Sequence, residues 1–364
     1  MSAQTHASAP YKGLMPYSEE DAPFFFGRET EQEIITANLM ASRLTLLYGP
    51  SGVGKSSVLR AGVAHNLRRL ARENLDESGS PQFAVVVFNT WRDDPVAGLE
   101  ARVRDSAMLA LNGKAAGPVS PFIDLSVLPP SRSLVDSIRA STKCLGGELL
   151  IILDQFEEYF LYHGREDGEH SFAVQFPRAV NSSDLNVNFL ISIRDDALAK
   201  LDMFQGRIPI LFDNRLGIAH LDRTAAQAAI TKPIEQFNRL YAAGRQRMGV
   251  EPELVGAVLD QVKTGEVVLG EAGRGAIKDK VRGTQIETPY LQLVMERLWN
   301  EERAAGSSVL RLETLNRLGG AESIVRTHLD AFMLTLTPNE QDIASDVFHY
   351  LVTPFRHEDR AHRI

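Results

Sequence analysis

The residues with the most specific chemistry lie in one glycine-rich loop near residue 50. An apolar run precedes this loop, a helical pattern follows it, and it fits the pattern G-x-x-x-x-G-K-[ST]. Its glycines allow successive backbone N–H groups to point at phosphate oxygens, and the positive end of the following helix attracts the same charge. The loop therefore predicts a nucleoside triphosphate site. It consists of Gly49, Pro50, Ser51, Gly52, Val53, Gly54, Lys55, Ser56 and Ser57.

Two side chains of this loop have individual expected roles. Lys55 is expected to reach the β- and γ-phosphates, and the hydroxyl of Ser56 is expected to ligate Mg²⁺. The predicted cofactors are therefore ATP or ADP together with Mg²⁺. The alternative is an ordinary glycine turn between a strand and a helix, which the flanking pattern disfavours.

A second motif is an apolar run that ends in carboxylates. Residues 149–153 are followed by Asp154, and Glu157 and Glu158 come shortly after it. A strand buried on both faces delivers the residue that follows it to the sheet edge where open α/β sheets bind ligands. Asp154 is thus predicted to hold Mg²⁺, through water, opposite Ser56. Glu157 or Glu158 is predicted to orient and deprotonate the attacking water, and the choice between them stays open.

A third candidate is the arginine that ends the next apolar run. Residues 187–193 lead into Arg194, which should reach the same edge of the sheet as Asp154. An arginine at this place can bind the γ-phosphate and make hydrolysis a conformational signal. The alternative is a surface salt bridge with Asp195 or Asp196.

These residues require a sheet of parallel strands to position them. Strand-like runs alternate with helical stretches, which predicts parallel pairing, helices on both faces and a three-layer α/β domain that ends near residue 222. The spacing of Lys55 and Asp154 leaves room for one additional strand between them in the chain, which is typical of the ATPase (ASCE) division of P-loop folds. Ras-like GTPases and small kinases fit less well. After the P-loop strand, the predicted strands are 83–88, 149–153, 187–193 and 216–221, and two crossover helices are 95–111 and 134–140.

The chain beyond residue 224 is predicted to be helical, without strands. Residues 265–287 mix glycine, lysine and arginine and are expected to form a solvated basic loop, with nucleic-acid contact as the alternative. Residues 1–10 are expected to form a frayed tail. Residues 117–131 are expected to form a surface loop. The helix-period stretches are 225–237, 252–262, 289–303, 321–336 and 339–351.

Composition is that of an ordinary soluble protein of two or three domains. The chain has 364 residues, a formal net charge of −8 and a single cysteine, Cys144. This balance gives no overall attraction to nucleic acid or anionic lipid. The sequence has no signal peptide and no apolar run of about 18 residues, so we expect a cytoplasmic protein without a membrane partner.

Several segments together resemble the novel STAND NTPases, which are relatives of the NACHT and apoptotic ATPases. The resemblance covers nearly the whole chain after residue 10. The segments that carry it are 10–14, 25–29, 49–57, 154–158, the strand that ends at Arg194, 287–292, 298–299 and 318–322.

The resemblance implies a domain organisation and two further binding residues. It implies that Arg28 lies near the nucleotide base and that Pro289 contacts adenine. Gln155 stands where AAA+ machines place a catalytic glutamate, so water activation shifts to Glu157 or Glu158, as in NACHT-like sequences. The expected domains are a nucleotide-binding domain over 11–222, a helical lid over 223–305 and a winged-helix-like domain over 306–364, either incomplete or part of a longer protein.

The resemblance further implies a slow ATPase that works as a molecular switch in signalling or anti-phage defence. ADP would hold a closed state, and ATP would favour an open state that self-associates and engages an unidentified sensor or effector. The alternative is an AAA+-like motor or loader acting on nucleic acid, for which the basic loop is the only support. A third possibility is a nucleotide-binding scaffold with negligible turnover.

Overall fold

The computed structural model of the chain describes residues 9–112, 133–242, 246–263 and 285–352. Its contacts define two compact units, and each is described by itself. The sheet unit spans residues 15–220, and the helical unit combines the residues up to 14 with those from 221 onward. The surface loop predicted over 117–131, most of the predicted tail and most of the basic loop lie outside the described residues.

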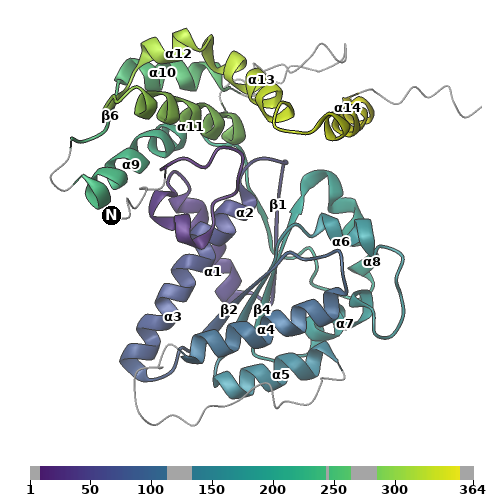
Figure 1. The fold of residues 1–364 in the computed structure, drawn as a ribbon. Helices are drawn as coiled ribbons and strands as arrows, with labels where there is room; N and C mark the ends of the chain where they lie inside the picture. The colour runs from purple at the N-terminus through teal and green to yellow at the C-terminus, as the bar shows by residue number, and fades with distance from the viewer. Residues whose placement is uncertain (1–8, 113–132, 243–245, 264–284, 353–364) are drawn as a thin grey trace, which may run out of the picture. The chain divides into compact units, whose positions relative to one another are not determined.

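The sheet unit contains five parallel strands in the order β2-β3-β4-β1-β5. This confirms the predicted five-stranded α/β fold. Figure 1 labels β1, β2 and β4 of this sheet. Because β4 lies between β1 and β3, the strands that end at Arg194 and just before Asp154 are direct neighbours. The strands are β1 (Leu44–Gly49), β2 (Phe83–Phe88), β3 (Glu148–Leu153), β4 (Val187–Arg194) and β5 (Arg215–Gly217).

Helices cover both faces of this sheet, because the side chains of each central strand alternate between two apolar clusters. On β3, Leu149, Ile151 and Leu153 pack with residues of α4, α5 and α7, whereas Leu150 and Ile152 pack with residues of α1, η2 and α3. The helices of the first face are α4 (Pro95–Asn112), α5 (Leu134–Leu145) and α7 (Phe172–Asn181). Those of the second are α1 (Glu29–Ala41) and the continuous run of α2 (Lys55–Ser57), the π-helical η2 (Val58–Ala64) and α3 (His65–Ser78).

Short elements complete the sheet unit. η1 (Glu19–Phe24) precedes α1, α6 (Glu157–Tyr162) follows β3, and η4 (Asp195–Leu201) and α8 (Asp202–Gln205) follow β4. The strand predicted over 216–221 is shorter than expected. The apolar pattern continues beyond β5 because Ile218 packs into the core and Leu221 pairs with Ile286 of the helical unit.

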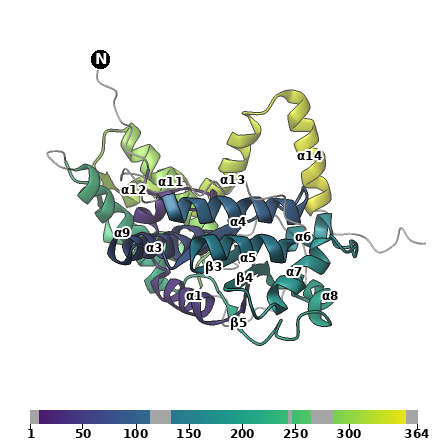
Figure 2. The same ribbon diagram turned by 90° about the horizontal axis from the view of Figure 1, so that it is seen from below.

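The helical unit is mostly α-helical, as predicted, but it also contains a two-stranded parallel sheet of β6 (Gly249–Val250) and β7 (Val309–Leu310). The prediction that no strand follows residue 224 is therefore wrong. Two residues per strand are too few to give a period-2 signal. α13 and α14 are successive helices that meet at an angle (Figure 2). The helices are α9 (Arg223–Tyr241), α10 (Pro252–Gln261), α11 (Thr288–Ala304), α12 (Leu312–Arg317), α13 (Gly320–Met333) and α14 (Pro338–Val352).

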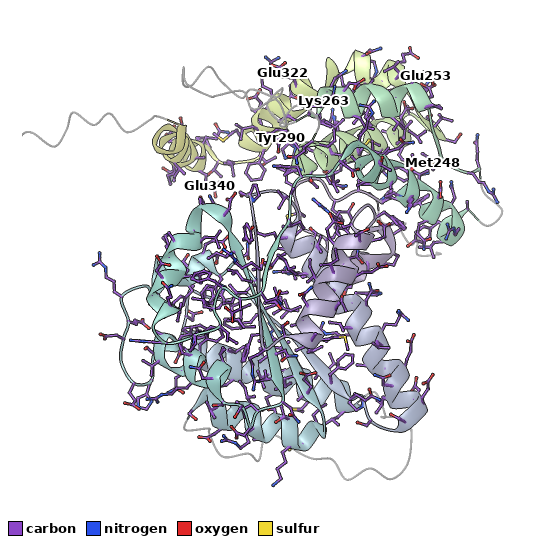
Figure 3. All side chains as sticks on the ribbon, turned by 180° about the vertical axis from the view of Figure 1, so that it is seen from behind. Met248, Glu253, Lys263, Tyr290, Glu322 and Glu340 are labelled. Carbon is purple, nitrogen blue, oxygen red and sulfur yellow. The ribbon has the colours of Figure 1, made fainter. Side chains whose placement is uncertain are left out.

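Two local anchors hold parts of the helical unit together. Asn238 near the end of α9 exchanges two hydrogen bonds of 2.8 Å with the backbone of Met248. Met248, which is labelled in Figure 3, leads into β6. Near the N-terminus, the buried Tyr11 donates its hydroxyl hydrogen to the carbonyl of Ile230 at 2.5 Å and meets the ring of Trp299 edge-on. Among the described helices, none is both long and apolar enough to cross a membrane.

Candidate functional site

The glycine-rich loop connects β1 to the helix that begins at Lys55. Gly54 has φ +91°, a left-handed backbone conformation that residues other than glycine rarely adopt. At Gly49, a Cβ would lie 2.2 Å from the carbonyl oxygen of Ile218, so only glycine fits against this neighbouring backbone. The loop therefore has the backbone shape that the motif predicts.

Lys55 folds back over its own loop. Its Nζ donates to the carbonyls of Gly49 and Pro50, at 2.7 Å and 2.9 Å. Burial lowers the pKa of Lys55, and the carboxylates of Glu157 and Asp195 oppose that shift, followed by Asp154. A phosphate oxygen would give the ammonium a partner of opposite charge in place of two neutral carbonyls, which adds Coulomb attraction to the hydrogen bond.

Two other predicted binding residues, Ser57 and Arg28, connect the loop to neighbouring backbone through hydrogen bonds. The Ser57 hydroxyl accepts a hydrogen bond from the backbone N–H of Tyr17 at 3.1 Å. Arg28 is buried, and its Nη2 donates to the carbonyls of Val53 and Ala219, at 2.9 Å and 2.8 Å. Arg28 thus binds the backbone that frames the loop, and its place near the nucleotide base stays a prediction from the resemblance.

Replacing Arg28 by methionine is expected to lower the free energy of unfolding by about 2–4 kcal/mol, because two buried carbonyls would lose their donor. ATP binding should weaken as well, since Val53 belongs to the loop. Thermal melting and titration of a labelled nucleotide would measure both effects. The exposed Arg69 on α3 provides the control, because Arg69→Met removes an equal charge without touching the loop. A melting temperature equal to that of the wild type would show that Arg28 does not hold the loop.

Asp154 lies at the end of β3 with its side chain 1% exposed. Its Oδ1 accepts the N–H of Gln155 at 3.0 Å, and its own N–H donates to the carbonyl of Phe88 at 2.8 Å. Gln155 has φ +55°, a conformation that non-glycine residues seldom adopt and that is frequent at functional sites. The backbone therefore turns sharply directly after the predicted metal ligand.

An aromatic cluster supports this turn from the other face of the sheet. The indole Nε1 of Trp91 donates to the Asp154 carbonyl at 2.8 Å. Burial raises the pKa of Tyr159 in the same cluster to about 12, so its phenol stays neutral. Sequence reasoning missed this support because its members come from distant segments. The cluster consists of Phe88, Trp91, Phe156, Tyr159, Phe160, Phe172, Phe176, Phe189 and Phe204.

Arg60 is a second residue that the sequence did not single out. Its Nη2 lies 3.5 Å from Oδ2 of Asp154, and its Nε is buried without a hydrogen-bond partner in the described part of the chain. Ser56 and Arg60 are four residues apart on one helix, a spacing that places side chains on the same face. The spacing of four residues from Ser56, a predicted metal ligand, is the feature of the sequence that could have indicated Arg60.

Glu157, Glu158 and Arg194 meet at the same edge. Glu157 accepts the backbone N–H of Arg194 with Oε2 at 3.2 Å. Burial raises the pKa of Glu158, and the charges of Glu157 and Asp154 add to the shift. The guanidinium of Arg194 makes two hydrogen bonds to the carboxylate of Asp196, at 3.0 Å and 2.5 Å. The structure thus contains the salt bridge that was the alternative interpretation of Arg194, and its sensor role stays a prediction.

Pro289 belongs to the first turn of α11 in the helical unit. Its proposed contact with adenine therefore stays a prediction from the resemblance.

The donor set fits Mg²⁺ carried by a phosphate rather than a protein-only metal site. In the described part of the chain, no group of three or more His, Cys, Asp or Glu side chains could hold a metal ion. Asp154 and Ser56 could supply one carboxylate and one hydroxyl. Mg²⁺ is commonly held by one or two carboxylates together with water and substrate phosphates.

The P-loop after β1, the buried acid after β3 and the intervening β4 define a P-loop NTPase of the ATPase division. The model of the novel STAND NTPase 1 family matches residues 10–364, and the chain belongs to that family. A search of curated proteins finds no match to the chain.

Several solved structures are similar to this chain at low identity. The ORC2 protein of Aeropyrum pernix in its ADPNP–ADP complexes has 16% identity and a TM-score of 0.49, over 84% of this chain and 68% of that one. A Walker-type ATPase of Pyrococcus abyssi has 14% identity and a TM-score of 0.48, over 93% and 80% of the two chains. The A. pernix ORC1 protein in complex with DNA has 15% identity and a TM-score of 0.47, over 86% and 69%.

Proposed function

We propose that this protein is an ATP-binding, slowly hydrolysing molecular switch in signalling or anti-phage defence. The observation that carries the proposal is the position of Arg194 on the strand next to the one that leads into Asp154, in an ion pair that is 43% exposed on the arginine side. Exposed ion pairs contribute only about 0–1 kcal/mol, so a γ-phosphate could replace Asp196 at small cost. Arg194 would then have one partner with ADP and another with ATP.

In this proposal the glycine-rich loop and the acidic edge, which consists of Asp154, Glu157 and Glu158 after β3, have separate roles. Lys55 and the backbone of residues 49–57 bind the phosphates, and Ser56 and Asp154 hold Mg²⁺. The chemistry that Mg²⁺ supplies when bound is neutralisation of charge on the phosphates. Glu157 or Glu158 orients the attacking water and accepts its proton. Slow turnover suits a switch, because the ATP state must persist long enough to be read.

The remaining parts of the proposal concern the response to ATP. ADP holds a closed state, and ATP favours an open state that self-associates and engages a sensor or effector. Pro289 would contact adenine. A ligand shifts such an equilibrium only by its different affinities for the two states, so a residue that distinguishes ATP from ADP is required.

Replacing Arg194 by alanine is expected to remove the difference between the ATP and ADP states without abolishing nucleotide binding. The wild-type protein should show different protease sensitivity in residues 224–303 with ADP and with a non-hydrolysable ATP analogue. The mutant should be digested alike with both. Asp196→Asn is the matched variant, because it frees Arg194 and should keep or enlarge the difference. If Arg194→Ala retains the wild-type difference, Arg194 serves only in the surface ion pair.

Measurements of turnover on the wild-type protein would also distinguish the switch from the motor or loader alternative. Most of the basic loop on which that alternative depends lies outside the described residues. Turnover stimulated by DNA would favour a motor, whereas slow turnover with tightly retained ADP would favour the switch.

A further inference from the structure

We propose that Arg60 is an internal counter-ion of Asp154 that competes with Mg²⁺ for the carboxylate, and so raises the Mg²⁺ concentration that nucleotide binding requires. This inference rests on the proposed nucleotide site. It assigns a regulatory role to a residue outside the P-loop motif and the acidic edge.

The buried carboxylate of Asp154 needs a positive partner. The carboxylate is 1% exposed, and a buried carboxylate without compensation is costly. Its Oδ1 accepts one backbone hydrogen bond from Gln155, and its Oδ2 faces Nη2 of Arg60 at 3.5 Å. Arg60 therefore provides a positive charge beside the oxygen atom that is not bonded to the backbone, in addition to the electrostatic interaction of Asp154 with Lys55.

The contacts that hold the Arg60 side chain are weak. A separation of 3.5 Å is at the long end of the hydrogen-bond range. The Arg60 side chain is 26% exposed and its Nε has no partner among the described residues. By contrast, Arg28 is 5% exposed, and its Nη2 donates to two carbonyls at 2.9 Å and 2.8 Å. The Arg60 guanidinium can therefore leave Asp154 at a smaller cost than Arg28 would pay to leave the loop.

The local shape of the helix explains why Arg60 lies near Asp154. Arg60 lies in η2, a π-helical stretch of the run that begins at Lys55, and such stretches are frequent at functional sites. The neighbouring Val58 and Leu59 pack into the same cluster as Leu150 and Ile152 of β3. Since Asp154 continues that alternation, it emerges on the face that η2 covers, and residue 60 is near it for this reason.

The consequence is competition between like charges. A guanidinium beside Asp154 repels a second cation at the same carboxylate, and this repulsion is strong where water is scarce. Binding of Mg²⁺ then requires Arg60 to move away. Without Mg²⁺, Arg60 returns and keeps the buried carboxylate compensated.

The test compares Mg²⁺ requirements by direct binding, with no measurement of turnover. Fluorescently labelled ADP is titrated first in EDTA and then at increasing Mg²⁺ concentration. In Arg60→Met, which keeps the aliphatic stem and removes the charge, the half-saturating Mg²⁺ concentration is expected to fall about threefold to tenfold. Arg60→Gln is a second neutral variant, in which the half-saturating Mg²⁺ concentration should fall as well. It serves as the test if the methionine variant does not fold. Arg69→Met, on the exposed side of α3, should leave the requirement unchanged.

The outcomes separate this inference from the proposed function. If the wild-type protein binds no ADP, the proposed function is overturned and this inference falls with it. If ADP binds and both neutral variants need as much Mg²⁺ as the wild type, the inference alone is overturned. A higher requirement in the variants would also overturn it, because Arg60 would then assist the metal or phosphate instead of competing.

Discussion

Replacing Lys55 by alanine is expected to weaken ATP binding by about 2–4 kcal/mol while leaving the fold intact. The ammonium lies on the loop carbonyls of Gly49 and Pro50, within the field of Glu157, Asp195 and Asp154. Without it, these carboxylates would repel a triphosphate. Titration of a fluorescent ATP analogue measures the loss, and circular dichroism checks the fold. Lys143→Ala, on an exposed position of α5, is the matched control. An unchanged affinity in Lys55→Ala would refute the assignment of the loop as a phosphate site.

Replacing Glu157 and Glu158 singly by glutamine is expected to leave nucleotide binding near normal and to slow hydrolysis about 10²- to 10⁴-fold in at least one variant. Glutamine keeps the shape of the side chain, and its amide oxygen can still accept the Arg194 N–H that Glu157 accepts now. The ATPase rate at saturating ATP is the measurement, with Glu33→Gln as an exposed control on α1. If neither variant loses rate, the acidic residues are structural and the scaffold interpretation is preferred.

The pH dependence of the rate would distinguish the two glutamates. A general base must be deprotonated, and burial raises the pKa of Glu158 above its ordinary value of 4.5. If Glu158 is the base, the rate falls as the pH is lowered, because Glu158 becomes protonated. This fall begins at a pH above 4.5, since the pKa of Glu158 is raised. Glu157→Gln would keep an acid limb but move it to lower pH, because the charge of Glu157 contributes to the raised pKa of Glu158. Glu158→Gln would remove it together with most of the rate.

The sequence predicted the central strands closely, because buried parallel strands are nearly continuous apolar runs. The run at 83–88 coincides with β2, and the helix predicted over 95–111 is α4 to within one residue. The apolar pattern predicted the short outer strands less well. β5 lies at the sheet edge, and the apolar run that contains it continues to Leu221, which pairs with Ile286 in the helical unit. β6 and β7 pair with each other although they are distant in the chain.

The candidate site was predictable only where its residues are local in sequence. The loop and Asp154 follow from a short motif and from the end of an apolar strand. The contacts that frame them do not, because Arg60 and Asp154 are 94 residues apart and Arg28 and Ala219 are 191 apart. Arg194 shows a different limit, since its guanidinium pairs with the neighbouring Asp196, and a phosphate is only proposed to compete for it. Sequence spacing alone does not decide that competition.

The segment before Met15 has a consequence for how this protein can be dissected. Because Tyr11 packs with Ile230 and Trp299, the sheet unit is in effect an insertion within the helical unit, and the backbone joins the two at both of its ends. A fragment that begins at residue 221 would lack the aromatic ring that covers Trp299 and the donor to Ile230. Expression of the helical unit alone therefore calls for residues 9–14 joined ahead of residue 221 through a short linker that takes the place of the inserted sheet unit.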